Sequence, residues 1–526
     1  MSSNLRIIMF FFLLLVINSA PCINSTPSMK STEADNSQIL ESAGDIFTSI
    51  CGAEVRISKT PEAFEGYNLF VLAKTDKETL QRNLWMLIVD LNGEVLLEEY
   101  LGVDLWISDC AAEFINPATI LLGKDFSAAI YNLTDESTTI LPFGGHHDYE
   151  YNPLDDTFFA LQRYELEIDE IMYQYDTVVE LDRNGNVVWS FDTASLINVN
   201  QWCPYQDYEF SLPDITHMNT VYFDAYDDSI YLMSRNTNTF WKINHSTGDV
   251  VWALGEFGDF TLYDQRGIQR NNLFFHAHAV ERVDDETFIL FDNDYHNQTD
   301  EFNEVSRIVE ISIDEDTMTA NTTWEWSSEE YYSFLFGDAD RLPNGNRLGV
   351  FGIAGFPNSE YGARIVEVNE EHEIVWEMAF ANDETYWYMI YRNERFQFHP
   401  ILQVLDVENS DSEGSITINF GAYFNYRPKR DLPGFYSLYI DDVLIGEGGV
   451  IFDRFWRPAI VSCSVPNPGT GHPNVTLIVW NGNGDSARIT AEFGVTSIAD
   501  NALLLFAVGI VGVIGLIILW KHRNSK

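Results

Sequence analysis

Cysteine is scarce in this sequence of 526 residues, which contains five cysteines, at positions 22, 51, 110, 203 and 463. No CxxC pair and no Cys/His spacing of the kind that binds zinc occurs, which argues against a structural zinc site. One or two structural disulfides remain open, with Cys51 and Cys110 as a candidate pair.

Basic side chains are also scarce, because 30 Lys and Arg stand against 80 Asp and Glu, a formal net charge of −50 at pH 7. This balance argues against general affinity for nucleic acid or for anionic lipid. The simplest interpretation is a surface built for solubility. An anionic substrate would be repelled at long range, so its binding site would need a local basic pocket.

Long apolar runs occur only near the two ends of the chain. At the N-terminus, Arg6 precedes the apolar run 7–17, and small residues follow it up to Ala20. A basic start, an apolar centre and a small-residue exit are typical of a secretory signal. We therefore predict a signal peptide over residues 1–20, followed by a polar N-terminal segment and lead-in over residues 21–60.

The uncharged stretch from Asn501 to Trp520 has about the length that crosses a bilayer core of roughly 30 Å. Basic residues follow it in the tail 521–526, and basic flanks stay on the cytoplasmic side. The sequence thus predicts a single-pass membrane protein that meets the lipid bilayer through Asn501 to Trp520. Its large N-terminal part would be extracytoplasmic and its short tail cytoplasmic, with a buried core helix as the alternative for this stretch.

Six N-x-[ST] sequons are compatible with glycosylation of an extracytoplasmic surface. They lie at Asn24, Asn132, Asn244, Asn297, Asn321 and Asn474.

A weak repeat runs along residues 61–400, where long helical periodicity is absent. One half of the unit is a strand, a turn and a second strand that often ends in Trp, as in ELDRNGNVVWSF from Glu180. Its copies begin at Val89, Ile130, Glu180, Ile243, Ile311 and Val366. A second strand–turn–strand half precedes each copy, as in TVYFDAYDDSIYLMS from Thr220. Two hairpins per unit and six units predict an all-β fold with a six-bladed β-propeller, with two β-sandwiches as the alternative.

The pattern changes after His399-Pro400 to short strands such as SITINFGAYF and NVTLIVWNG. We interpret residues 403–495 as a small β-sandwich that acts as a spacer between the propeller and the predicted membrane helix.

Histidines gather where three predicted blades begin. The third blade opens with Gly145-His146-His147-Asp148, the fourth with Thr216-His217-Met218-Asn219 and the fifth with Phe275-His276-Ala277-His278. The first strand of each blade lines the central channel, so these residues are expected to converge near the axis. A single histidine at a strand start would more often be structural, but three starts in register favour a functional cluster.

The second strand of each blade returns to the same rim of the channel. There the sequence has Arg163 in blade three, Arg235-Asn236 in blade four and Asp292-Asn293 in blade five. Imidazole can supply a nucleophile, an acid and a base near neutral pH. Arginine adds a fixed cation with forked donors that suit tetrahedral oxyanions.

These residues resemble the arylsulfotransferase family, whose members transfer sulfuryl groups without a nucleotide donor. The stretch from Asp214 to Gly255 is similar to the family signature, with a His-x-Asn pair, an Arg-Asn after the second strand and a final Gly-Asp-Val-Val-Trp. The segments from Gly145, from Phe275 and from Tyr391 (YRNERFQFHP) also fit, in the order of the family. The resemblance covers roughly residues 60–400 and implies a six-bladed propeller.

The resemblance further implies transfer from a phenolic sulfate ester to a phenol acceptor through a transient sulfohistidine, with no cofactor. By motif, His217, Asn219 and Arg235 would be active-site residues, His278 the sulfated histidine and His147 the remaining channel histidine. Alternates for these roles are His276, His146, Arg163 and Asn293. His147 or a neighbour would protonate the leaving phenolate.

Two other functions remain open on the sequence. A histidine cluster on a propeller axis could hold iron or zinc, although an adjacent arginine would repel the metal cation. A surface propeller could also bind a sulfated or aromatic ligand, or a partner protein, without catalysis.

Overall fold

The computed structural model describes residues 45–201, 212–294, 305–328, 330–353, 359–410, 415–466 and 474–492. This part of the chain is all-β, with two short 3-10 helices, η1 (Ile107–Cys110) and η2 (Thr193–Ser195). Within it, no helix is both long enough and apolar enough to cross a membrane. The predicted signal peptide (1–20) and membrane span (501–520) lie outside the described residues.

Six sheets of four or more strands account for the chain up to residue 396. The first holds β28 (Tyr386–Phe396), β3 (Tyr67–Asp76), β4 (Arg82–Asp90) and β5 (Val95–Val103). The second holds β6 (Ala112–Asn116), β7 (Thr119–Lys124), β8 (Ser127–Asn132) and β9 (Ser137–Ile140). The third holds β10 (Tyr149–Asn152), β11 (Thr157–Ile168), β12 (Ile171–Leu181) and β13 (Val187–Asp192).

The fourth sheet holds β14 (Met218–Asp224), β15 (Ser229–Ser234), β16 (Thr239–Asn244) and β17 (Val250–Gly255). The fifth holds β20 (His278–Arg282), β21 (Thr287–Asp292), β22 (Arg307–Asp314) and β23 (Thr319–Ser327), and is extended by β18 (Thr261–Tyr263) and β19 (Gln269–Arg270). The sixth holds β24 (Asp338–Arg341), β25 (Arg347–Phe351), β26 (Tyr361–Val368), β27 (Ile374–Ala381), β2 (Ala53–Lys59) and β1 (Ile46–Ile50).

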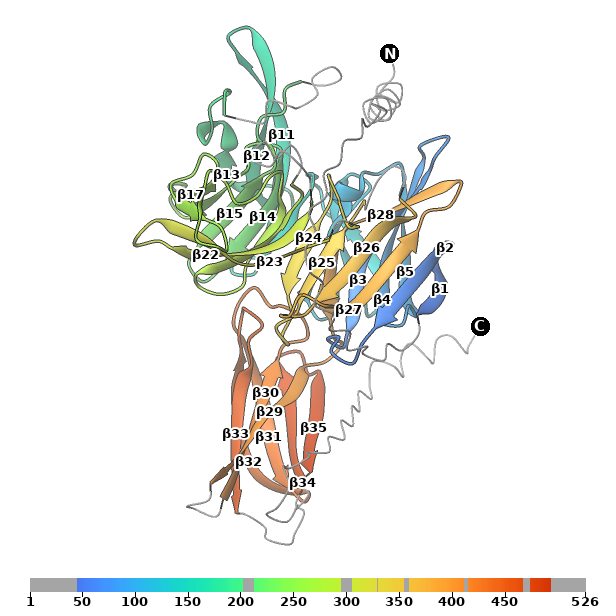
Figure 1. Ribbon diagram of the computed structural model, residues 1–526, viewed down its shortest axis with the longest axis vertical. Coiled ribbons are helices and arrows are strands. Elements are labelled where there is room, and N and C mark those ends of the chain that lie inside the picture. The colour runs from blue at the N-terminus through green and yellow to red at the C-terminus, as the bar shows by residue number, and fades with distance from the viewer. Residues whose placement is uncertain are drawn as a thin grey trace, which may run out of the picture.

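The first strand of each sheet contacts the next sheet in turn, from β28 through β6, β10, β14, β20 and β24 and back to β28. These contacts close the six sheets into a ring, which agrees with the predicted all-β, propeller-like fold. Figure 1 shows the labelled strands of these sheets in the upper part of the molecule. Both ends of this segment close the ring, because β28 pairs with β3 and β2 pairs with β27.

The repeated hairpin turn has a local physical cause. In blade one, the Asp90 carboxylate accepts the backbone N–H groups of Asn92 and Glu94 at 2.9 and 2.7 Å. In blade three, Asp182 accepts those of Asn184 and Asn186 in the same way. Each turn then needs a glycine with positive φ, +85° at Gly93. Aspartate and glycine at this spacing therefore explain why these hairpin turns are recognisable as a repeat in the sequence.

The remaining strands form two sheets below the ring, drawn in orange and red in Figure 1. One sheet holds β29 (Ile401–Ser410), β30 (Ser415–Tyr423) and β33 (Ala459–Pro466). The other holds β32 (Val443–Phe452), β31 (Leu432–Ile440), β34 (Asn474–Asn481) and β35 (Ser486–Glu492). Buried side chains of both sheets, such as Phe420 and Leu477, belong to one apolar core, and we refer to this unit as the sandwich.

The candidate disulfide between Cys51 and Cys110 is wrong. Both side chains are free thiols, as is Cys463. Cys51 lies in the turn after β1 on the sixth sheet, whereas Cys110 ends η1 between the first and second sheets. Because the ring puts these positions on different blades, the two thiols do not pair.

Candidate active site

Three histidines occupy the same unusual backbone position at the openings of neighbouring blades. His147, His217 and His276 have φ values of 61°, 42° and 55°. A side chain in this left-handed region costs free energy, and such residues concentrate at functional sites. The histidine positions inferred from the repeat therefore share one local geometry, just before or at the first strand of each blade.

The cluster at this end of the channel consists of His147, His217 and His278, joined by Tyr391 of β28. The rings of His147 and His217 lie 4.9 Å apart, edge to face. The Tyr391 ring lies 6.1 Å from His147 and 6.0 Å from His278, again edge to face. Blades one, three, four and five thus each contribute one ring to a single site.

His278 is held in one tautomer by Asn293. Its Nδ1 lies 2.6 Å from Asn293 Oδ1. The Asn293 amide nitrogen donates to the carbonyls of Ser333 and Phe336 at 2.7 and 3.2 Å, so its oxygen must face the histidine. An oxygen can only accept here, so His278 carries its proton on Nδ1 and leaves the Nε2 lone pair available.

The other two histidines are tied through Nδ1 as well. His217 Nδ1 lies 2.6 Å from Asp214 Oδ2. His147 Nδ1 lies 2.7 Å from His146 Nδ1, and His146 Nε2 lies 2.9 Å from the buried Asp176. Because Asp176 accepts from His146 Nε2–H, His146 Nδ1 accepts from His147. Within the described residues, Nε2 makes no hydrogen bond on His147, His217 or His278.

The three imidazoles are held neutral. Burial, reinforced by the neighbouring charge of Arg235, keeps the pKa of His278 well below its usual value. Burial does the same to the pKa of His147, where the nearby rings of His217 and His146 and the cation of Arg163 further disfavour a positive charge. Burial lowers the pKa of His217 too, although Asp214 opposes the shift. At neutral pH each histidine is therefore a lone-pair donor and a proton acceptor.

Three arginines surround these rings in a chain of strongly negative net charge. Arg235 follows β15, is buried, and donates from Nη1 to Asn236 at 3.0 Å. Arg163 lies on β11, and its charge acts on both His147 and His217. Arg392 follows Tyr391 on β28, and its charge acts on His278. Together they supply the local positive charge that an anionic substrate requires in so acidic a protein.

Other predicted residues lie beside the cluster and support it. The Asn219 amide donates to the Ala277 carbonyl at 2.7 Å and so ties blade four to blade five. His146 stands behind His147, as described above. His276 is buried and its backbone N–H donates to Asn238 at 2.9 Å. Among the described residues, its ring makes no stacking contact with the three clustered imidazoles.

Four further polar residues of the site were missed in the sequence. Asp176 and Asp214 orient histidines, and Tyr391 and Arg392 reach the site from the strand that closes the ring. The segment from Tyr391 had been noted for its resemblance alone. The segment lies next to blades three to five because β28 pairs with β3. No local sequence pattern predicts this long-range pairing. Within the described residues, no group of three or more His, Cys, Asp or Glu is placed to hold a metal ion.

The cations of this site are suited to bind a tetrahedral oxyanion. The neutral imidazoles can act as nucleophile and base when the group around its central atom is transferred. Residues 58–392 match the family model described as Arylsulfotransferase (ASST). The chain belongs to the arylsulfotransferase family, which supports aryl sulfotransferase activity in general terms, with an aryl sulfate donor and a phenol acceptor. No curated protein matches the sequence.

Solved structures with some likeness include hydrazine synthase of Kuenenia stuttgartiensis, at 7% identity and a TM-score of 0.28, which covers 59% of this chain and 75% of that chain. A luciferin-regenerating enzyme shows 11% identity and a TM-score of 0.28, covering 67% and 89%. A putative 6-phosphogluconolactonase from Bacteroides fragilis shows 10% identity and a TM-score of 0.27, covering 66% and 86%. Likeness at this level supports no conclusion about function.

Proposed function

We propose that this protein moves a sulfuryl group from an aryl sulfate to a phenol in two steps, through a sulfated His278. The observation that carries the proposal is the hydrogen bond from His278 Nδ1 to Asn293, which leaves a neutral Nε2 lone pair on a ring that the charge of Arg235 reaches. His278 also contacts the Tyr391 ring of the cluster, edge to face, with 6.0 Å between the ring centroids.

In the first step, His278 Nε2 forms a bond to sulfur as the bond between sulfur and the phenolic oxygen breaks. The electron pair of that bond leaves with the phenolate, and the N-sulfo ring keeps its proton on Nδ1. Charge spreads over the three sulfuryl oxygens in the transition state, where the charges of Arg235 and Arg163 stabilise it.

In the second step, the acceptor phenol attacks sulfur, and the N–S electron pair returns to His278. The phenolic proton passes to Nε2 of His147 or His217 and then to solvent. Burial lowers the pKa of His147, so its Nε2 is unprotonated at neutral pH and can take up this proton. Protonation of the leaving phenolate by His147 or a neighbour, the role implied by the resemblance, stays a prediction. Over a full turnover the acceptor loses one proton and the departed phenolate gains one.

The test of this mechanism is initial-rate kinetics with 4-nitrophenyl sulfate and a phenol. A two-step transfer gives parallel double-reciprocal lines as the acceptor concentration changes. We expect His278→Asn to lower kcat by about a thousandfold or more, whereas the matched control His276→Asn keeps most of it. Normal turnover by His278→Asn would disprove the role of His278.

We also propose that the site works on the outer side of a membrane, because the chain begins with a signal-like segment and ends with the apolar stretch 501–520. Added protease should then cleave the ring on intact cells without permeabilisation. Protection of the whole chain would contradict this location.

A further inference from the structure

The sandwich touches the far end of the same channel that holds the histidines. Strand β14 begins next to His217 and ends at Asp224, which is contacted by Arg454 of the sandwich at 3.2 Å. Strand β20 begins at His278 and ends at Arg282, which pairs with Asp224 at 2.6 Å. The inner strands thus run from the histidine cluster to the sandwich.

Lys429, between β30 and β31 of the sandwich, closes this end of the channel. Its Nζ lies 2.6 Å from Glu113 Oε2 and 2.5 Å from Glu150 Oε2. Glu113 lies on β6 and Glu150 on β10, so one sandwich lysine bridges two blades. The neighbouring Arg427 pairs with Glu281 of β20. Basic side chains of the sandwich therefore meet an acidic channel mouth.

A cavity of about 30 Å³, roughly the space of two water molecules, is lined by both Lys429 and Arg392. Seven carboxyl groups line it against these two cations: Glu113, Asp148, Glu150, Glu281, Asp338, Asp340 and Glu394. The second oxygen of Glu150 is buried and has no hydrogen-bond partner within the described residues. Burial raises the pKa of Glu150, Asp340 and Glu394, so part of this set is protonated at neutral pH, and Lys429 and Arg392 stabilise the ionised members. Loss of one cation would leave these carboxylates to compete for the other.

Arg392 connects this cavity to all three histidines. It donates to Asp148 at 2.9 Å, and Asp148 follows His147 in the chain. It also donates to the Asn219 carbonyl at 3.0 Å and to Thr220 Oγ1 at 3.3 Å. That Thr220 oxygen accepts the backbone N–H of Ala279, the residue after His278, at 2.9 Å. One guanidinium thus fixes the strand starts of blades three, four and five.

We propose that Lys429 is a positioning residue for the sulfuryl-transfer site: by pairing with Glu113 and Glu150, it keeps Arg392 in contact with Asp148, Asn219 and Thr220. The sandwich is then part of the catalytic unit rather than a spacer. This inference rests on the proposed function of the site. Without the lysine, Arg392 is the remaining cation that lines the cavity, so we expect it to shift toward Glu113 and Glu150 and the three strand starts to lose their common anchor.

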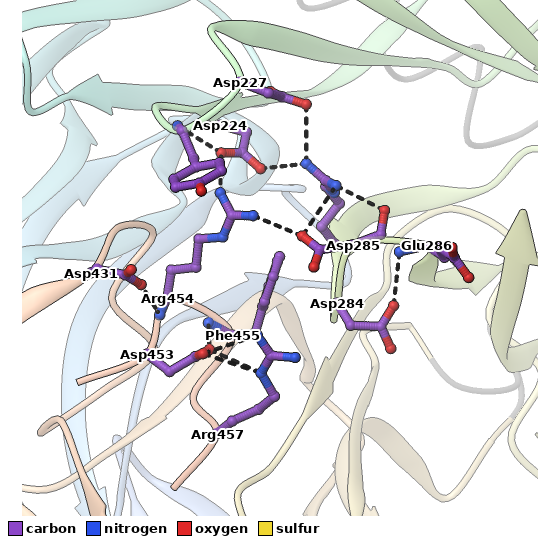
Figure 2. A network of polar contacts seen from close by, with 12 residues as sticks. Asp224, Asp227, Asp284, Asp285, Glu286, Asp431, Asp453, Arg454, Phe455 and Arg457 are labelled. Carbon is purple, nitrogen blue, oxygen red and sulfur yellow. Dashed lines mark hydrogen bonds and ion pairs between the residues drawn. The ribbon is translucent and has the colours of Figure 1, made fainter. Parts of the chain in front are cut away.

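Arg454 provides a matched control, because it joins the same two domains outside the cavity. Figure 2 shows its guanidinium between Asp224 and Asp285, at 3.2 and 2.9 Å. It also stacks on the Tyr226 ring, 4.0 Å from the ring centroid. Replacement of Arg454 weakens docking of the sandwich, but it leaves the charges of the channel cavity unchanged.

The experiment compares Lys429→Met, Lys429→Arg and Arg454→Met in the full chain. With 4-nitrophenyl sulfate as the donor, we expect Lys429→Met to lower kcat by about 10- to 100-fold, with partial recovery in Lys429→Arg. Arg454→Met should lower the thermal midpoint while kcat stays within about twofold of the unchanged protein, as expected for a contact remote from the site. Equal losses in the Met variants, or unchanged kcat in Lys429→Met, would overturn the proposal.

A second readout needs no turnover. The charge of Arg392 helps to lower the pKa of His278, so NMR titration of ¹⁵N-labelled histidine should show that pKa rising in Lys429→Met but not in Arg454→Met. If the unchanged protein transfers no sulfuryl group and this shift still occurs, the proposed function fails and the positioning role stands. If the unchanged protein transfers the sulfuryl group, but Lys429→Met changes neither kcat nor the pKa of His278, the positioning role fails. If Lys429→Met does not fold, the double variant Lys429→Met with Glu150→Gln replaces it in both measurements. The second substitution removes the carboxylate that the first leaves unpaired.

Discussion

Each histidine of the cluster owes its tautomer to a polar partner at Nδ1. Asn293 fixes His278, Asp214 fixes His217, and His146 with Asp176 fixes His147. In every case the partner contacts Nδ1 of the histidine. The other ring nitrogen, Nε2, is therefore available for chemistry on all three rings. The repeat predicted the positions of the histidines, but two of these four partners, Asp214 and Asp176, were assigned no role from the sequence. Only Asn293 and His146 had been noted, as alternates.

The Asn293 contact gives a prediction at this scale. Replacement of Asn293 by Leu removes the acceptor for Nδ1–H, so the ring can adopt the wrong tautomer, and we expect kcat to fall about 100-fold. Asn293→Asp keeps an acceptor oxygen and should retain more activity than Asn293→Leu. Initial rates with 4-nitrophenyl sulfate measure both, and equal rates in the two variants would contradict the role of the tautomer.

Among the elements, β28 matters most to the site and was the hardest to foresee. The hairpin repeat could be predicted because Asp and Gly at fixed spacing make its turns locally. The place of β28 depends instead on pairing with β3, more than 300 residues earlier in the chain. Tyr391 and Arg392 therefore enter the site through ring closure, a non-local event.

The same strand carries a pH-dependent group, Glu394. Burial, with the nearby charge of Glu113, raises the pKa of Glu394 to about 8. A raised pKa means that the folded protein favours the protonated form of the Glu394 carboxyl. The resulting contribution to the free energy of unfolding is complete below the ordinary glutamate pKa of 4.5, and it is lost as the pH rises to about 8. Burial likewise raises the pKa of Asp148 and of Asp338 to about 6.

We therefore expect the thermal unfolding midpoint to fall between about pH 4.5 and pH 8. Glu394→Gln should flatten this fall between about pH 6 and pH 8, because glutamine stays neutral. Exposed Glu384, in the turn before β28, is the matched control, and Glu384→Gln should leave the pH profile unchanged. A profile that is flat in the unchanged protein would contradict the burial of an ionisable Glu394.

For the whole molecule, the sequence predicted a ring and a separate sandwich but not how they meet. The sandwich had been interpreted as a spacer. Its loops instead insert Lys429 and Arg454 into acidic positions of the ring. Ion pairs between the two domains join side chains that lie far apart in the sequence. The overall charge of −50 therefore does not show which of the few cations form these pairs.

The charge of the whole molecule makes a testable difference to substrate capture. An aryl sulfate is an anion and is repelled by the acidic surface before it reaches the arginines. Because salt screens this repulsion, kcat/KM should rise about threefold or more between roughly 0.01 M and 0.15 M ionic strength, with kcat little changed. A steady fall of kcat/KM with added salt would mean that the local arginines dominate the approach instead.

The central claim is a sulfuryl group carried on His278. Incubation with 4-nitrophenyl sulfate and no acceptor, followed by rapid quenching and peptide mass analysis, tests it directly. The account predicts a gain of about 80 Da, the mass of SO₃, on His278 itself, retained in His276→Asn and absent in His278→Asn. Transfer to phenol with no labelled histidine, or a label on His276, would contradict it.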